Sequence, residues 1–260
     1  MQFLSLRSIC VLAILLSAET CQAGTITAEL TGTTNNGAPT VSINDGSGSA
    51  TLTPYNFAGY INWTLKSNNS SSAILPTFNS FCIELTQDVN IGGTYTYAIA
   101  ALEDSPSPGS AATGGPSGMG SVKADALRRL WGGFYSDTMS KNDAAAFQLA
   151  IWKIEYDGIA STISDFSHGN FRASSTTSAV ITTATQLYNN VVTNVYDESL
   201  AASNLIALSD PVLQDQITYT GNSPGILGTP EPSTLCLGVI GGVAFGAARY
   251  RRRRPQLPIS

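Results

Sequence analysis

Hydrophobic and polar side chains alternate along much of the chain that precedes residue 105. The alternation is clear in residues 26–30 and again in residues 60–65, and it has the period of a β-strand with one buried face. Turn sequences separate such runs, with Asn-Asp-Gly at residues 44–46 and Ile-Gly-Gly at residues 91–93. This part of the chain is therefore predicted to form antiparallel strands joined by turns.

One of these strands is predicted to contain Cys82, and residues 95–99 are expected to continue from it as the second strand of a hairpin. A loop rich in Pro, Gly and Ser, residues 105–120, then marks a change of pattern. Its nearest lysine, Lys123, belongs to an acidic domain, and the spacing is not that of a phosphate-binding loop. We therefore assign the loop no ligand.

Beyond the loop, apolar side chains recur at helical spacing and predict three helices, which two closing strands follow. The helices are expected over residues 121–135, 143–156 and 175–197, and the strands over residues 205–208 and 217–219. Ser140 or Asn142 is the expected N-cap of the second helix. The pattern indicates an α+β fold, with about three helices inserted into an antiparallel β-sandwich or barrel framework.

Charge is unevenly distributed along the chain. The whole sequence has 13 basic and 18 acidic side chains, of which residues 24–228 hold 7 and 16. An acidic domain repels phosphate backbones, so we expect no nucleic-acid partner. Charged residues make up 12% of the chain, and Gly, Ser, Thr and Asn are plentiful. This composition is typical of a secreted β-rich domain rather than of a cytosolic helical enzyme.

The first segment, residues 1–23, has the three parts of a secretory signal peptide. Arg7 supplies the positive charge, an apolar core follows, and Cys21 and Ala23 provide the small residues of a cleavage site. We expect signal peptidase to cut after Ala23. Two alternatives fit less well: a lipoprotein signal at Cys21 has an acid, Glu19, where small apolar residues are usual, and a buried N-terminal helix would show a polar face.

The C-terminal segment, residues 229–254, has a tripartite pattern. Pro230, Glu231 and Pro232 precede an apolar, Gly-rich run at residues 235–248, and a basic cluster closes the run. The cluster consists of Arg249, Arg251, Arg252, Arg253 and Arg254. The run is short for a bilayer core that needs about 20 residues, although arginine stems can extend it. The positive-inside rule keeps the arginines and residues 255–260 cytoplasmic.

This C-terminal segment resembles the PEP-CTERM sorting signal of exported bacterial proteins. The resemblance implies that an exosortase, a membrane transpeptidase-like protease, recognises the segment and hands the protein over to the cell surface or extracellular matrix. The hydrophobic helix would then anchor the chain in the inner membrane only transiently. The alternative is a lasting single-pass anchor, and both interpretations place residues 24–228 outside the cell.

Four cysteines occur, at positions 10, 21, 82 and 236, and Cys82 alone belongs to the exported domain. A single cysteine cannot form an internal disulfide, so the thiol needs another explanation. In the predicted strand, Ile83 and Leu85 share the apolar face, whereas Cys82 shares the polar face with Ser80 and Glu84. We therefore expect a reachable thiol. The alternative is a small buried hydrophobic residue.

Gln148 lies among the most apolar residues of the second predicted helix, with Ala145 and Trp152 on the same stripe. An unsatisfied buried amide costs roughly 1–3 kcal/mol, so this side chain needs partners. One solution is ordinary hydrogen bonding, for example to the backbone of a strand. The other is covalent: the Cys82 thiolate attacks the side-chain carbonyl, ammonia leaves, and a thioester joins strand to helix.

The segments around these two residues resemble the Cys-Gln thioester domains of bacterial surface proteins. Those domains carry an aromatic-Cys-aliphatic strand and a helix with Thr-Gln-x-Ala-Ile-Trp. The matching residues are Phe81, Cys82 and Ile83 in the strand and Gln148, Ala150, Ile151 and Trp152 in the helix, whereas Phe147 replaces the threonine.

The resemblance implies that Cys82 and Gln148 form a thioester, and that the domain captures amine- or hydroxyl-bearing surfaces covalently. A single acyl transfer of this kind is adhesion rather than enzyme turnover. The sequence does not identify the surface or polymer that would be captured. Glu84, two residues from Cys82 on the same predicted face, is the candidate for managing the proton or the departing ammonia.

Two other functions fit parts of the sequence. A Cys-His hydrolase would pair Cys82 with His168, the one histidine of the chain, although no motif links the two. A non-reactive structural or carbohydrate-binding surface module would use Tyr55, Tyr60 and Trp63 as stacking platforms. Their alternating strand favours core packing instead.

We expect neither a metal nor another cofactor. One histidine and one cysteine cannot form a zinc site in the exported domain. Residues 44–48 lack the spaced carboxylates of a calcium loop and are predicted to form a turn.

Overall fold

The computed structural model of the protein describes residues 24–35, 40–44, 49–52, 58–105, 118–159, 165–174, 177–193, 202 and 204–221. The expected signal peptide, the sorting motif at residues 230–232 and the arginine cluster lie outside these ranges, as do Tyr55 and residues 45–48. Within the described ranges, none of the helices has the length and apolar character needed to cross a bilayer.

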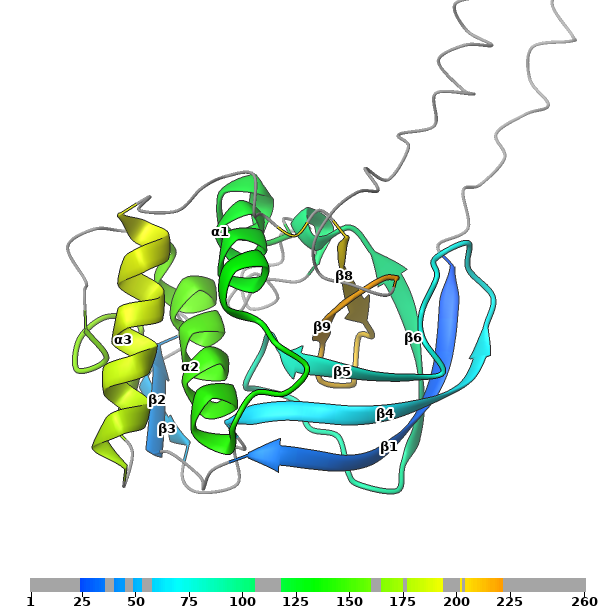
Figure 1. Cartoon of the computed structure of the whole chain (residues 1–260), viewed down its shortest axis with the longest axis horizontal. Helices are drawn as coiled ribbons and strands as arrows, with labels where there is room; N and C mark the ends of the chain where they lie inside the picture. Colours follow the sequence, from blue (N-terminus) through cyan, green and yellow to red (C-terminus); the bar gives the residue numbers. More distant parts are fainter. Residues whose placement is uncertain are drawn as a thin grey trace, which may run out of the picture.

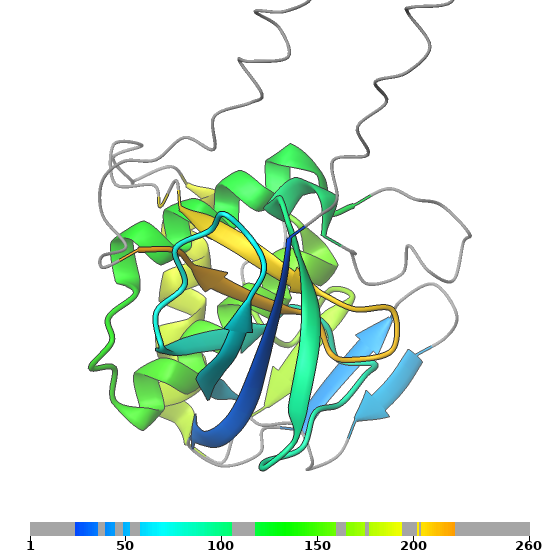
Figure 2. The ribbon, with the colours of Figure 1, turned by 90° about the vertical axis from the view of Figure 1, so that its right-hand side faces the viewer.

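Six antiparallel strands close into a barrel in the order β1-β4-β5-β9-β8-β6 (Figure 1). They are β1 (Thr25–Asn35), β4 (Gly59–Asn68), β5 (Thr77–Cys82), β6 (Thr94–Ala100), β8 (Leu205–Ser209) and β9 (Gln216–Tyr219). Figure 2 shows this barrel in front of the helices. Because β8 and β9 close the barrel between β5 and β6, the last described part of the chain lies beside the strand of Cys82.

The alternating pattern of β1 and β4 turns one face of each strand into the barrel. Leu30 is buried and pairs with Trp63 of β4. The Trp63 ring stacks on Phe78 of β5 with a centroid separation of 6.2 Å, and it meets the edge of Tyr97 of β6 at 5.9 Å. These large apolar side chains fill the interior and connect four strands.

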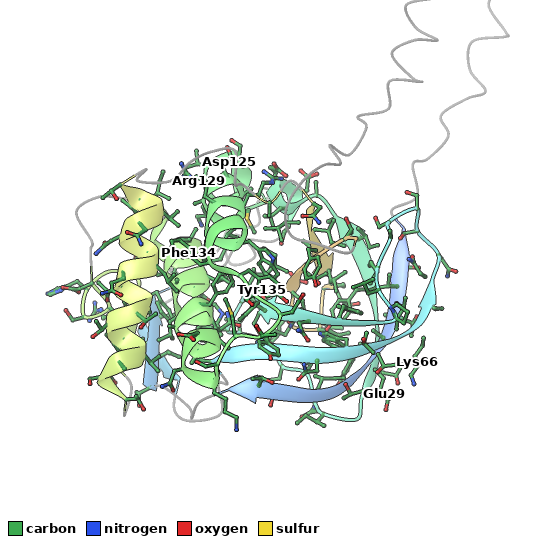
Figure 3. All side chains as sticks on the ribbon, viewed as in Figure 1. Glu29, Lys66, Asp125, Arg129, Phe134 and Tyr135 are labelled. Carbon is green, nitrogen blue, oxygen red and sulfur yellow. The ribbon has the colours of Figure 1, made fainter. Side chains whose placement is uncertain are left out.

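Three helices lie on one side of the barrel (Figure 1): α1 (Gly120–Phe134), α2 (Lys141–Asp157) and α3 (Ser178–Val192), with α2 against the barrel and α3 packed on α1 and α2. Ser140 is the N-cap of α2, and its Oγ accepts a hydrogen bond from the Asp143 N–H at 3.2 Å. Phe147 of α2 packs on the outward side of β5 against Phe81, with ring centroids 4.9 Å apart. Tyr135, just after α1, also faces this strand (Figure 3).

A small second sheet packs against α2. It consists of β2 (Thr40–Asn44), β3 (Ser49–Leu52) and β7 (Phe171–Ser174), in the order β3-β2-β7. Phe171 contacts the rings of Trp152 and Tyr156 on α2 at 5.9 and 6.0 Å. A short 3-10 helix, η1 (Leu102–Asp104), follows β6. The barrel, two helices and the second sheet thus surround α2, and every side chain from residue 144 to residue 156 is buried.

These elements confirm the α+β class and the three predicted helices, and they make the β framework a closed barrel. Two expectations about the strand of Cys82 are wrong. The strand is expected to continue through Leu85, but β5 ends at Cys82. Residues 95–99 are expected to form a hairpin with it, but β6 pairs with β1 and β8. The physical reason is the closure of the barrel, because β8 and β9 lie between β5 and β6 and take the pairing that a hairpin would have used.

Candidate functional site

Cys82 is the last residue of β5, and 5% of its surface is exposed. It shares the barrel-facing side of the strand with Ser80, which is buried as well. The opposite face, where Phe81 packs on Phe147, is covered by α2. The expectation of a reachable thiol on a polar face is therefore wrong, because this part of the sheet is covered on both sides.

Gln148 of α2 meets Cys82 through the main chain. The Cys82 N–H donates to Gln148 Oε1 at 3.0 Å, and Gln148 Nε2 donates to the Cys82 carbonyl oxygen at 2.7 Å. The pairing of β5 with β4 ends at Ser80. At Cys82, two residues later, the Gln148 amide therefore makes the two main-chain hydrogen bonds that a residue of β4 would otherwise make. The structure brings Gln148 to Cys82 as expected, but its carbonyl faces the main-chain N–H and not the sulfur.

The sulfur contacts a different glutamine, Gln214, in the segment between β8 and β9. The Cys82 thiol donates to Gln214 Oε1 at 3.0 Å. Gln214 Nε2 donates to the main-chain oxygen of Glu84 at 3.1 Å, and the Tyr97 hydroxyl donates to the main-chain oxygen of Gln214 at 3.3 Å. These bonds hold the Gln214 carbonyl group against the sulfur.

The sequence reasoning missed Gln214, which lies 132 residues after Cys82 in a short polar segment without a motif. One signal was available. Residues 217–219 are predicted to form a closing strand, and pairing of that strand with the strand of Cys82 brings the residues just before it to the thiol. The sequence alone does not say which strand it pairs with.

A third glutamine, Gln216, is the cross-strand neighbour of Cys82 on β9. Its Nε2 lies 3.7 Å from the Cys82 sulfur. Its Oε1 accepts from the Ser80 hydroxyl at 2.9 Å, and that hydroxyl accepts in turn from Trp63 Nε1 at 2.7 Å. Cys82 is therefore enclosed by three glutamine side chains, one on its main chain and two on its sulfur.

Burial sets the protonation of this cluster. It raises the pKa of the Cys82 thiol to about 12; a hydrogen bond from Gln216 opposes the rise, and the carboxylates of Glu84 and Asp88 add to it. Burial also raises the pKa of Glu84 to about 7 and that of Asp215 to about 6. Near neutral pH the thiol is therefore protonated, and the Glu84 carboxyl is the group that can exchange a proton.

A cavity of about 480 Å³ adjoins the cluster, and both Cys82 and Gln214 form part of its wall. Its other lining residues come from the ends of β1 and β4, the segment after β5, and α2. They are Leu30, Thr33, Gly59, Tyr60, Ile61, Leu85, Asp88, Val89, Asn90, Ile91 and Trp152. The wall is mostly apolar, and among the described residues that line it Asp88 is the charged one. A small group that enters this cavity would reach the Cys82–Gln214 contact.

His168 lies apart from this cluster. Its side chain is 78% exposed, and Nδ1 lies 2.7 Å from Ser167 Oγ and 3.1 Å from Asp165 Oδ1. Among the described residues, no hydrogen bond joins His168 to Cys82. The arrangement that a Cys-His hydrolase needs is not present in this structure.

The aromatic side chains proposed as sugar platforms are in the core where the structure describes them. Trp63 is 1% exposed and Tyr60 is buried as well. An exposed stacking role for these two is therefore wrong, because Trp63 packs on Phe78 inside the barrel and Tyr60 packs on Phe81 of β5. In the described ranges, His, Cys, Asp and Glu side chains do not gather in a group that could hold a metal ion.

The fold and the site define a class: a closed six-stranded antiparallel barrel with a helical layer and a buried Cys-Gln cluster beside a cavity. No protein-family model, no curated protein and no solved structure matches the chain. The chemistry of the cluster is therefore the basis for a functional assignment.

Proposed function

We propose that this protein is an exported bacterial surface protein in which Cys82 and Gln214 form an internal thioester. In this reaction the Cys82 sulfur bonds to the side-chain carbonyl carbon of Gln214. The bond from that carbon to Nε2 breaks, and the nitrogen leaves as ammonia with the thiol proton. The kind of bond is the one expected from the sequence, but Gln214 takes the place of Gln148.

The contact between Cys82 and Gln214 is the observation that carries this proposal. The sulfur lies 3.0 Å from Oε1, and the carbonyl carbon is one C=O bond, about 1.23 Å, from that oxygen. Nucleophile and electrophile are thus held together before they react, which makes the step effectively unimolecular. Gln148 supports this geometry because its amide binds both the N–H and the carbonyl oxygen of Cys82 and so fixes the main chain there.

Glu84 keeps the proton-handling role predicted from the sequence. Gln214 Nε2, which leaves as ammonia, donates to the main-chain oxygen of Glu84, and the Glu84 carboxyl accepts from the N–H of Asp215 at 3.1 Å. The charge of the Glu84 carboxyl acts on the Cys82 thiol, and its pKa is about 7, so we assign to it the transfer of the thiol proton to the departing nitrogen.

The adjoining cavity is the route by which a target would reach the thioester. An amine or hydroxyl group that enters it attacks the Gln214 acyl carbon, forms an amide or ester there and frees the Cys82 thiol. Until then the burial of Cys82 and the mostly apolar wall of the cavity limit how much water meets the activated acyl group. Each molecule reacts once, so the outcome is covalent adhesion and not turnover.

Export is part of the proposal and rests on the two terminal signals in the sequence. The signal peptide at residues 1–23 and the PEP-CTERM-like segment at residues 229–254 imply signal peptidase and exosortase as partners during export. They place the acidic domain at the cell surface or in the extracellular matrix, after transient anchoring in the inner membrane. A surface location brings the thioester to the amines and hydroxyls of other surfaces.

Methylamine followed by peptide mapping tests the proposal and distinguishes the two glutamines. If Cys82 and Gln214 form a thioester, methylamine will leave an N-methylamide on the peptide that contains Gln214 and will free one thiol. A tag on the peptide with Gln148 would restore the sequence-based pairing. Absence of a tag, together with a full-mass protein, would contradict thioester chemistry; Cys82→Ala is the control that must take up no methylamine.

The alternative is a non-reactive surface module, and one observation favours it. Gln148 is fully satisfied by the Cys82 main chain, and Gln214 and Gln216 also have partners, so the cluster is stable without a covalent bond. This alternative predicts a full-mass protein in which the Cys82 thiol is alkylated quantitatively after unfolding.

A further inference from the structure

A directed chain of hydrogen bonds fixes how the Gln216 amide is oriented. The indole Nε1 of Trp63 can only donate, and it donates to Ser80 Oγ at 2.7 Å. The one hydroxyl proton of Ser80 is therefore free to donate to Gln216 Oε1, at 2.9 Å. Because Oε1 is held by Ser80, the Nε2 of Gln216 must face the other way, toward the sulfur of Cys82.

The two N–H groups of Gln216 Nε2 have different surroundings. Nε2 donates to the main-chain oxygen of Gln214 at 3.1 Å, which accounts for one N–H. The other faces the reacting pair, with Nε2 at 3.5 Å from Gln214 Oε1 and 3.7 Å from Cys82 Sγ. Gln216 is buried, so no bulk water competes for this donor. A long ground-state contact of this kind tightens when negative charge develops on the oxygen.

We propose that Gln216 is the oxyanion donor of the thioester site, and that Ser80 and Trp63 are positioning residues that aim it. When the Cys82 sulfur bonds to the Gln214 carbonyl carbon, the carbonyl electron pair moves to Oε1, and Gln216 Nε2–H donates to the resulting oxyanion. The pair returns to the carbon as ammonia leaves. The same donor serves when an amine later attacks the thioester. This inference rests on the proposed thioester and extends it.

Gln216→Leu tests the role, because it removes the donor and keeps a side chain of similar size. The rate at which the purified protein loses one ammonia after refolding, and the rate at which methylamine consumes the thioester, should both fall about 100-fold or more, as for loss of one oxyanion donor. The infrared carbonyl band of the thioester should shift to higher frequency, because its hydrogen bond is lost.

Ser80→Ala is the second variant, and it keeps the proposal testable if Gln216→Leu does not fold. Without the Ser80 hydroxyl the Gln216 amide can turn over and place its oxygen beside Gln214 Oε1, so both rates should also fall. Thr218→Val is the matched control: it removes a buried hydrogen bond from the same strand, to the Asn79 main-chain oxygen, without touching the cluster. It should lower stability and leave both rates unchanged.

The outcomes separate this inference from the proposed function. A wild-type protein of full mass would overturn both. A wild-type thioester whose formation, methylamine reaction and carbonyl frequency are unchanged in Gln216→Leu and Ser80→Ala would overturn the oxyanion role alone. If Thr218→Val slows both reactions as much as Gln216→Leu does, the loss of rate would come from a general destabilisation of β9. That result would also contradict the oxyanion role of Gln216.

Discussion

Two buried polar clusters lie on opposite sides of α2, and they differ in what their polar atoms face. At one, Cys82 at the end of β5 is enclosed by the neutral amides of Gln148 on α2, Gln216 on β9 and Gln214 just before β9. At the other, Lys153 and Asp157 of α2 form an ion pair of 2.7 Å with both side chains fully buried. Lys153 Nζ also donates to the main-chain oxygens of His168 and Phe171, at 2.5 and 3.0 Å.

The ion pair acts as a clamp. Asp157 accepts from the main-chain N–H groups of Asn170 and Phe171, so the two side chains tie residues 168–171 to α2 through acceptors and donors alike. The cysteine cluster instead sets a nucleophile against a carbonyl group and borders a cavity. Buried polar side chains alone therefore do not indicate a reactive site. A reactive site also needs a nucleophile, an electrophile and a route by which a reactant can enter.

Breaking the clamp should give the largest loss of stability. Lys153→Met leaves Asp157 as a buried charge without its partner and frees two carbonyl groups, so the free energy of unfolding should fall by about 3–5 kcal/mol. Urea denaturation measures this loss. Lys141→Met, at an exposed position at the start of α2, is the control and should change little. A loss below about 1 kcal/mol in Lys153→Met would show that the pair does not act as a clamp.

Two of the three glutamines of the cysteine cluster, Gln148 and Gln214, should separate stability from chemistry. Gln148→Leu leaves the N–H and C=O of Cys82 unpaired, at about 1–3 kcal/mol for each group. Gln214→Leu loses the side-chain hydrogen bonds to Cys82 and Glu84 and the long contact with Gln216, and should cost about 1–2 kcal/mol, yet it removes the thioester completely. Urea denaturation and intact mass are measured on both variants. A Gln214→Leu protein that still lacks one ammonia would contradict the assignment.

Stability should decrease with rising pH because of Glu155, which is fully buried on α2. Neither of its carboxylate oxygens has a hydrogen-bond partner among the described residues, and burial raises its pKa to about 8 despite the nearby Lys123. Since the folded pKa exceeds the ordinary value of 4.5, the stabilising contribution is complete below pH 4.5 and is lost as pH rises through about 8.

Glu155→Gln is the variant that isolates this contribution, because Glu84 and Asp215 titrate in the same direction and remain in both proteins. The unfolding free energy of the wild type relative to Glu155→Gln should fall by a few kcal/mol between about pH 5 and about pH 9. A difference that is independent of pH would mean that Glu155 is ionised in the folded protein at all these pH values.

The smallest effect is expected at the barrel rim far from the helices, where Glu29 and Lys66 lie (Figure 3). Their ion pair of 2.5 Å joins β1 and β4, but the two side chains are 35% and 45% exposed. Lys66→Ala should change the free energy of unfolding by less than about 1 kcal/mol in urea denaturation, and salt should weaken the effect further. A loss as large as that of Lys153→Met would remove the contrast between exposed and buried charges.

Much of the fold could be predicted because local signals there agree with the tertiary structure. Ser140 caps α2 as expected, and the turn at Gly92 has the positive φ that its glycine allows. Alternation placed Trp63 on the face that became the barrel interior. These features depend on neighbours in sequence, so the sequence pattern reports them directly.

The composition of the site could be predicted only in part, because it depends on which strands pair. The sequence predicts that Gln148 lies beside Cys82, and it does. The sulfur, however, faces Gln214, which lies there because β5 pairs with β9. Burial of Cys82 follows from the helical layer on one side and the barrel on the other. Neither is visible in the alternation of a single strand.

Intact mass spectrometry of the exported protein, purified without exposure to amines, is the decisive test for a thioester between Cys82 and Gln214. With the thioester present, the mass is lower than that of the sequence by one ammonia and Cys82 cannot be alkylated, whereas Cys82→Ala and Gln214→Leu both have full mass. A wild-type protein of full mass, with Cys82 alkylated as soon as it is unfolded, would contradict the thioester and leave a buried amide cluster with a structural role alone.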